Sequence, residues 1–310
     1  AAITKPLFPL ASTVTLVAFA RLVDRIGKGI RGAPRDALVA DVTPPAQRGA
    51  AFGLRQSLDT VGARLGPLLA IGLMALFNDD IRTVLWFAVI PAVISVAILL
   101  IFVRDPGPQH LLEDGTKRVP IKLRDLGGLG RFYWFVVGAG AVFTLARFSE
   151  AFLVIRAYDA GLPLALAPAV VAVMSIVFAL TAYPAGRLQD RFGARPPLLA
   201  GLAALIAADL LLAFGSGLVA VFLAIGLWGL HLGLTQGVLS ALVAHAAPAN
   251  LRGTAFGVFG LTVGVATLVA SLLAGILWDA VSPEATFLAG AGFAAAALIA
   301  FVALRLVERA

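Results

Sequence analysis

Apolar residues occur along this chain in runs of about twenty, separated by short polar segments. Runs such as 83–103, 165–182 and 287–304 are apolar on every face, whereas the strands of an outer-membrane barrel alternate apolar and polar residues. Runs of this length and character predict membrane-spanning helices. We expect an all-α polytopic membrane protein, in which residues 1–10 end one helix and further helices cover 12–41, 49–77, 81–103, 132–156, 163–186, 197–215, 218–245, 252–279 and 283–307.

The composition agrees with this class, because 60% of residues are hydrophobic and 13% are charged, with a mean hydropathy of +0.97. Ordinary soluble domains are about half apolar and a quarter charged. The chain has no Cys, and its three His lack the spacing of a zinc site. No nucleophile motif, metal cluster or phosphate loop is present either. We therefore expect no enzyme activity, no cofactor and no metal.

A net charge of +7 is compatible with a nucleic-acid partner, but the positions of the basic residues indicate another origin. One set of loops carries thirteen basic residues, and the opposite loops carry only Arg82 and Arg156. This bias orients a multi-pass protein of the cytoplasmic (inner) membrane, and it explains the charge without nucleic acid. The cytoplasmic set is Arg48, Arg104, Lys117, Arg118, Lys122, Arg124, Arg131, Arg187, Arg191, Arg195, Arg252, Arg305 and Arg309.

A long polar stretch with three prolines, residues 104–131, divides the hydrophobic part into blocks 1–103 and 132–310, and we interpret it as a cytoplasmic linker. The two blocks share a repeat. Residues 37–53 and 241–257 are identical at ten of seventeen positions without a gap, at an offset of 204 residues. The repeat is parallel, and the counterpart of the helix at 132 would precede the first residue of the chain. We expect that about two and a half helices are missing.

Helix 12–41 carries more charge than a hydropathy window accepts, but its repeat partner at 216–245 is long and apolar, so we expect it to span the membrane as well. A cytoplasmic amphipathic helix is the alternative. On a helical wheel seven of its eight charges share an arc of about 140°, while Asp41 falls on the other side near the cytoplasmic end, where we expect it to be solvated. Charge facing lipid is unfavourable, so this arc should face protein or a water-filled cavity, either as a solute site or as a salt-bridge ladder. The arc contains Arg21, Asp24, Arg25, Lys28, Arg31, Arg35 and Asp36.

Other helices carry isolated polar groups. Arg55 and Asp59 lie at i, i+4, and Arg147 and Glu150 lie at i, i+3 in an apolar segment, where a carboxylate beside a guanidinium can bind and release a proton. A pair that only neutralises itself is the alternative in each case. His231 is a candidate proton relay. Arg64 lies near mid-membrane, and the sequence indicates no partner for it.

Three motifs resemble those of the major facilitator superfamily. Gly186 to Arg195 resembles the family's G-x-L-x-D-R-x-G-R-R loop, with Asp190 and Arg191 in its centre. Arg21 to Gly29 is similar to the R-x-x-x-x-G-x-G motif of the fourth helix. The fifth-helix pattern of proton-coupled exporters is matched by Gly53, Gly62, Gly66 and Pro67.

The resemblance implies the end of the third through the twelfth helix of a twelve-helix transporter, with the fourth, seventh and tenth helices lining a central cavity. It implies two bundles that rock about a midplane site. We expect Asp190 near the cytoplasmic start of the helix at Arg48, as a latch of the inner gate, with Arg191 and Arg195 as possible ion-pair partners in the loop. Close helix approach is expected at Gly62 and Gly66.

The predicted function is a monomeric secondary transporter of a small solute, with protons as the coupling ion and export as the direction. Glu150 is the first candidate for the coupling carboxylate, and Asp59 is the second. An importer or exchanger of an anionic solute is the alternative that the basic helix 12–41 favours. A receptor or scaffold with the same fold and no transport is a third possibility, although charges lining a cavity would bring it no benefit.

Overall fold

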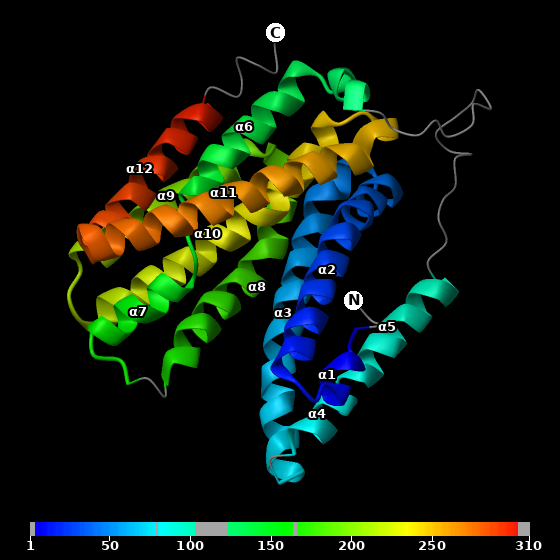
Figure 1. Cartoon of the computed structure of the whole chain (residues 1–310). Coiled ribbons are helices and arrows are strands. Elements are labelled where there is room, and N and C mark those ends of the chain that lie inside the picture. Colours follow the sequence, from blue (N-terminus) through cyan, green and yellow to red (C-terminus); the bar gives the residue numbers. More distant parts are fainter. Residues whose placement is uncertain (1–3, 79, 103–122, 164–165, 303–310) are drawn as a thin grey trace. The chain divides into compact units, whose positions relative to one another are not determined.

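The structure is a computed structural model that describes residues 4–78, 80–102, 123–163 and 166–302. Every regular element in these ranges is a helix (Figure 1), which confirms the all-α class. The chain divides into two compact units, Ala1–Leu38 with Ala63–Pro120 and Val39–Gly62 with Ile121–Ala310. Most of the predicted linker, at 103–122, lies outside the described residues, as do the last residues of the helix expected at 283–307.

The first unit contains α1 (Leu7–Leu10), most of α2 (Val14–Val42), the second half of α3 (Arg48–Leu76), α4 (Ile81–Phe87) and α5 (Val89–Phe102). The helix predicted over 81–103 is thus divided at Ala88. Pro91 explains the division, because proline has no N–H to donate and its ring crowds the carbonyl four residues earlier, at Phe87. Together α4 and α5 still form one membrane-length apolar segment, Ile81–Phe102.

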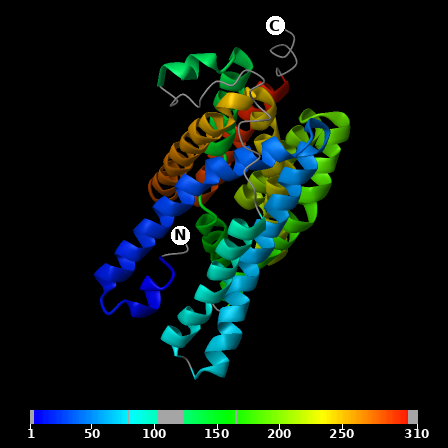
Figure 2. The same cartoon turned by 90° about the vertical axis from the view of Figure 1, so that its right-hand side faces the viewer.

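Helix α2 is one uninterrupted helix of 29 residues despite Pro34 in its interior, as the blue ribbon in Figure 2 shows. The sequence prediction of a single long helix here is confirmed. Seven helical segments of the described chain are long and apolar enough to cross a membrane, and α2 is not among them because of its charges. Its membrane span therefore stays a prediction from the repeat.

The second unit packs α6 (Arg131–Leu145), α7 (Ala151–Asp159), α8 (Ala167–Phe192), α9 (Arg195–Phe214), α10 (Gly217–Ala246), α11 (Arg252–Ala280) and α12 (Pro283–Val302). Helix α10 contacts both α8 and α9, and α12 lies against α9 and α6 (Figure 1). Glycines on α10 allow the close approach to α8, since a side chain at Gly229 would meet Met174 and one at Gly233 would meet Thr181. Trp228, between α9 and the 146–150 segment, is fully buried.

The helix boundaries reproduce the sequence repeat. Helix α3 begins at Arg48 and α11 at Arg252, and both are preceded by a 3₁₀ turn, Pro45–Gln47 and Ala249–Leu251. These positions differ by 204 residues, and the ends of the two helices, Leu76 and Ala280, differ by the same number. The predicted recurrence of a helix, a turn and a second helix is therefore confirmed at the level of secondary structure.

The prediction of one continuous helix over 132–156 is wrong. Helix α6 ends at Leu145, α7 begins at Ala151, and residues 146–150 are not helical. Neither Pro nor Gly occurs between them, but the Ser149 hydroxyl accepts a hydrogen bond from the N–H of Ala151 at the start of α7, which is a local capping contact. Phe148 packs against Phe152, Trp228 and Phe287, with ring centroids 5.4–5.7 Å apart, and burying this ring offsets the lost helical hydrogen bonds.

Candidate functional site

The charged face of α2 contains a compact ion-pair group. The carboxylate of Asp24 lies 3.1 Å from the ammonium nitrogen of Lys28 and 3.4 Å from that of Lys5, and it is only 5% exposed. The Thr4 hydroxyl donates to the same carboxylate. This is the salt-bridge ladder that the sequence allowed as one of its two alternatives.

The remaining basic residues of this face are not part of that group. Arg21, Arg25 and Arg31 are exposed within their unit, whereas Arg35 pairs with its neighbour Asp36 at 3.1 Å. Helix α2 thus carries one neutralised carboxylate at Asp24 and a row of exposed guanidinium groups. Such a row can attract an anionic solute by charge and by bidentate hydrogen bonds.

On α3, Arg55 and Asp59 form the expected i, i+4 ion pair at 3.0 Å, with the Asp59 side chain 52% exposed. A Cβ built at Gly62 or Gly66 would meet no atom of another described element within 4 Å, so the close helix approach expected there stays a prediction. Pro67 lies within the bounds of α3.

Arg147 and Glu150 fall in the break between α6 and α7, so the helical i, i+3 pairing predicted for them is wrong. The Arg147 guanidinium lies 5.5 Å from the ring centroid of Phe143, and Glu150 is exposed rather than buried. In the described chain these two side chains form no ion pair within 4 Å. A helix interrupted among apolar neighbours is typical of ion and substrate sites in transporters.

His231 on α10 is fully buried beside this break. Its Nδ1 lies 2.9 Å from the carbonyl oxygen of Gly201, and its ring centroid lies 5.2 Å from that of Phe143. A carbonyl only accepts hydrogen bonds, so Nδ1 carries the hydrogen and Nε2 keeps its lone pair. Nε2 has no hydrogen-bond partner among the described atoms.

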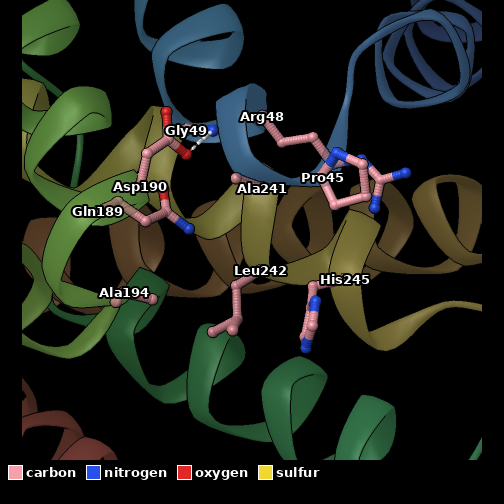
Figure 3. Close-up of a pocket in the computed structure, with 10 residues that line it drawn as sticks. Pro45, Arg48, Gly49, Gln189, Asp190, Ala194, Ala241, Leu242 and His245 are labelled. Atoms are coloured by element: carbon pink, nitrogen blue, oxygen red, sulfur yellow. Dashed lines mark hydrogen bonds between the residues drawn. The ribbon is translucent and has the colours of Figure 1, made fainter.

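Asp190 lies where the sequence placed it, at the start of α3. One of its carboxylate oxygens accepts a hydrogen bond from the backbone N–H of Gly49 (Figure 3) and the other from that of Ala50, both at 2.8 Å. A helix N-terminus has free N–H groups and a partial positive charge, so a carboxylate is favourable there. The contact is present as expected, while its role in gating stays a prediction.

The surroundings of Asp190 differ from the expectation in two ways. The motif is not a loop, because α8 continues through Asp190 and Arg191 to Phe192. Asp190 also forms no ion pair with Arg191 or Arg195 in the part of the chain that is described. Arg191 is exposed, and Arg195 donates to the carbonyl of Val302 at 3.0 Å, which ties the start of α9 to the end of α12.

The first half of α3 packs closely on α8 and α10 through a seam that we define as Gly49, Gly53, Gln56 and Ser57. A Cβ on Gly49 would collide with the Gly186 carbonyl, and one on Gly53 with the Ala182 carbonyl. The Gln56 amide donates to Gln236 on α10 at 2.7 Å, and the Ser57 hydroxyl donates to the Ala179 carbonyl, also at 2.7 Å. Of these four residues the sequence motifs identified only Gly53.

A second polar contact near the same helix ends was not predicted. Asp41, expected to be solvated, pairs with Arg252 at the start of α11, while Arg48 at the start of α3 donates to the Ala40 carbonyl at 3.1 Å. The repeat offers the only signal for this contact, since it aligns Arg48 with Arg252 and Asp41 with His245.

A pocket of about 220 Å³ lies between these contacts (Figure 3). Arg48 and Gly49 line it from α3, Gln189 and Asp190 from α8, and His245 from α10. The pocket and the two polar contacts lie at the helix ends that carry most of the basic residues, which the sequence assigns to the cytoplasm.

Comparison with known proteins gives the family. The family model described as Major Facilitator Superfamily matches residues 1–180 and 151–310. An uncharacterised MFS-type transporter of Methanocaldococcus jannaschii is 29% identical over 277 residues, which is 86% of this chain and 67% of that protein. The class B tetracycline resistance protein of Escherichia coli is 33% identical over 119 residues, or 38% of this chain and 28% of that protein.

Among solved structures, the transporter FucP of Escherichia coli in its outward conformation matches with a TM-score of 0.81. It is 16% identical, and the match covers 98% of this chain and 80% of that one. At this identity the likeness concerns the fold alone. Since the family model matches both parts of the sequence, this multi-pass membrane protein belongs to the major facilitator superfamily, a family of transporters and not of enzymes.

Proposed function

We propose that the protein is a secondary active transporter that exports a small solute across the cytoplasmic membrane in exchange for protons, as a monomer. The observation that carries the proposal is the contact of Asp190 with the N-terminus of α3. It joins helix ends 140 residues apart through two charge-assisted hydrogen bonds, which water can replace when the helices separate. A reversible closure at one membrane face is what alternating access requires.

Proton coupling is proposed for the break between α6 and α7. Glu150 is exposed there, and the guanidinium of Arg147 precedes it by three residues, so a solute that binds Arg147 would change the proton affinity of Glu150. Asp59 is the second candidate, because it pairs with Arg55 but remains half exposed.

Export is the proposed direction on two grounds. The pattern of Gly53, Gly62, Gly66 and Pro67 resembles that of proton-coupled exporters. One relative, similar over 38% of this chain, is a tetracycline resistance protein.

The test uses the full-length protein in inverted membrane vesicles that are acidified inside, with a fluorescent dye reporting the pH difference. Tetracycline and a panel of organic cations and anions are added one at a time. Exchange of an entering solute for internal protons should restore the dye fluorescence for at least one compound. No recovery with any compound, while a sodium gradient drives uptake, would overturn proton coupling.

Variants then assign the residues. Glu150→Gln should abolish transport driven by the pH gradient but preserve exchange of labelled for unlabelled solute, because exchange needs no net proton movement. Asp279→Asn, an exposed carboxylate at the far end of α11, is the matched control and should behave as wild type. Full pH-driven transport by Glu150→Gln would instead assign the coupling proton to Asp59 or to another carboxylate.

The exposed guanidinium groups of α2 favour a second candidate function, import or exchange of an anionic solute. Arg25→Ala and Lys28→Ala should then raise the half-saturating concentration of organic anions by about tenfold, a loss typical of a charged hydrogen bond. Equal transport of cations and anions by the variants would exclude this function.

A further inference from the structure

Asp209 on α9 is a carboxyl group enclosed in the interior of the second unit. Its side chain is 0% exposed, and its Oδ1 accepts a hydrogen bond from the indole Nε1 of Trp228 at 3.1 Å. Its other oxygen, Oδ2, has no hydrogen-bond partner among the described residues. Asp209 thus uses one of two acceptor oxygens in a setting from which water is excluded.

The niche around Oδ2 is formed by α12 and by the break between α6 and α7. A Cβ built on Gly290 of α12 would lie 2.7 Å from Oδ2 of Asp209 and 3.0 Å from Cε1 of Phe148. The glycine therefore leaves room for the carboxyl group, and the Phe148 ring closes the niche beside it. Because Phe148 belongs to the non-helical residues 146–150, a rearrangement of the break would uncover Asp209.

The charged and titratable groups around the niche do not neutralise Asp209. The break contributes Arg147, which lies over the ring of Phe143, and Glu150, which is exposed. Helix α10 contributes His231, whose Nδ1 is bound to a carbonyl. Helix α12 contributes Gly290 and Phe287, which carry no charge. Phe287 belongs to an aromatic group with Phe148, Phe152, Trp228 and Trp278. Over the described residues Asp209 has no basic group within ion-pair distance.

An ionised carboxylate buried without a cation is strongly unfavourable, whereas the neutral acid needs far less compensation. A neutral carboxylic acid can accept the Trp228 bond at Oδ1 and hold a hydrogen on Oδ2. We propose that Asp209 is a proton-binding site, with the proton on Oδ2, and that Phe148 and the break at residues 146–150 control its access to water.

Release follows from the same geometry. When Phe148 moves away, water reaches Oδ2, the O–H bond breaks, and the proton leaves on water while the carboxylate remains. Residues 146–150 include one basic residue, Arg147, which forms no ion pair with Asp209 in the described structure and could stabilise that carboxylate once the break rearranges. Coupling of this proton to solute movement rests on the proposed function, but proton binding itself does not.

The competing explanation is structural, with Asp209 serving only to tie α9 to Trp228. Asp209→Asn separates the two, because the amide oxygen still accepts from the indole but the group binds no proton. The measurement is infrared spectroscopy of the full chain in lipid nanodiscs, without solute or gradient. The C=O band of a protonated carboxylic acid should be present in the wild type and in Glu150→Gln, and absent in Asp209→Asn.

Transfer to heavy water tests the access route. Hydrogen–deuterium exchange of the acid shifts its C=O band, and this shift should be slow in the wild type and at least tenfold faster in Phe148→Ala. Phe152→Ala is the matched control, since Phe152 belongs to the same aromatic group but is not at the niche. Exchange as fast in Phe152→Ala as in Phe148→Ala would overturn the access role.

A band that persists in Asp209→Asn, or that is missing from the wild type near neutral pH, would overturn the proton site. If Asp209→Asn does not fold, Trp228→Phe provides the same test, because losing the indole donor should move the band without removing it. An unmoved band would assign the proton to another residue. Failure of the vesicle transport assay would leave these spectra unchanged, so the two proposals can fail separately.

Discussion

Asp41 forms an ion pair with Arg252, although the residue that the repeat aligns with Asp41 is His245. The polar contact at these helix ends is therefore asymmetric. Arg252 has a carboxylate partner, whereas its counterpart Arg48 binds the Ala40 carbonyl and shares a pocket with His245. The two halves of the repeat have the same helix boundaries but different polar contacts.

The Asp41–Arg252 pair is partly buried, with side-chain exposures of 23% and 13%, so it should contribute measurably to stability. We expect Asp41→Arg and Arg252→Asp each to lower the melting temperature, and the double exchange to recover part of the loss. The coupling free energy should be about 1 kcal/mol in a double-mutant cycle. Purely additive losses would show that the pair is not energetically linked.

The Asp190 contact predicts a change in accessibility. Because the chain has no Cys, Ala241→Cys, at a position that lines the pocket and is 3% exposed, can report opening through reaction with a membrane-impermeant maleimide. Asp190→Asn loses charge-assisted bonds to Gly49 and Ala50, and losing about 1.4 kcal/mol should raise labelling about tenfold.

The matched control for this experiment is Asp279→Asn, which removes a carboxylate at the other end of α11 and should leave the labelling rate unchanged. If Asp190→Asn labels at the wild-type rate, Asp190 caps α3 without holding the gate.

The seam on α3 predicts a difference between equivalent glycines of the repeat. A methyl group at Gly49 would lie 2.7 Å from Oδ1 of Asp190, whereas one at Gly253, the counterpart 204 residues later, meets nothing within 4 Å among the described atoms. Gly49→Ala should destabilise the contact with α8 by roughly 1–3 kcal/mol and raise the labelling rate of the Ala241→Cys reporter.

Gly253→Ala places the same methyl group at the equivalent position of α11, so the labelling rate should not change. Its stability should change only by the small gain expected from the higher helix propensity of alanine. Similar behaviour of the two variants, judged by thermal unfolding and labelling, would argue against the seam as a closing contact.

Asp80 predicts a local pH dependence outside the membrane-spanning segments. The hydroxyl and backbone N–H of Thr83, together with the N–H of Arg82, hold the pKa of this carboxyl below its usual 3.8, because they stabilise its charged form. Its contribution to the start of α4 should be complete above pH 3.8 and be lost as the pH falls through the lowered pKa.

Amide exchange at Arg82 and Thr83, corrected for intrinsic rates, should therefore accelerate at acidic pH. In Asp80→Asn, which cannot ionise, the corrected rates should no longer depend on pH. An unchanged acid response in this variant would assign the effect to another group.

Much of the fold could be predicted because its determinants are local. The length of α2, the equal bounds of α3 and α11, and the turns before them follow from apolar run length and from a repeat that is visible in the sequence. The contact of Asp190 with the start of α3 could also be predicted, since a carboxylate is electrostatically favoured at a helix N-terminus.

The break between α6 and α7 could not be predicted in this way. Residues 146–150 lie within a mostly apolar run and include neither Pro nor Gly, so run length and helix-breaking residues predict one continuous helix. In the structure Phe148 instead packs on Trp228 and Phe287 at the break. Because of this interruption, Glu150 lies at an exposed position and not in the buried helical pair that the sequence predicted.

The sequence by itself determined most of the helical segments, which helices recur and which of them carry charges. Only the tertiary structure decided which of those charges meet a partner. Asp24 is neutralised by Lys5 and Lys28, Asp41 by Arg252, and Asp209 by none of the described basic groups. The physical reason is distance: hydrophobic period and helix caps depend on neighbours within a few residues, whereas ion pairs and burial depend on helices that are far apart in the chain.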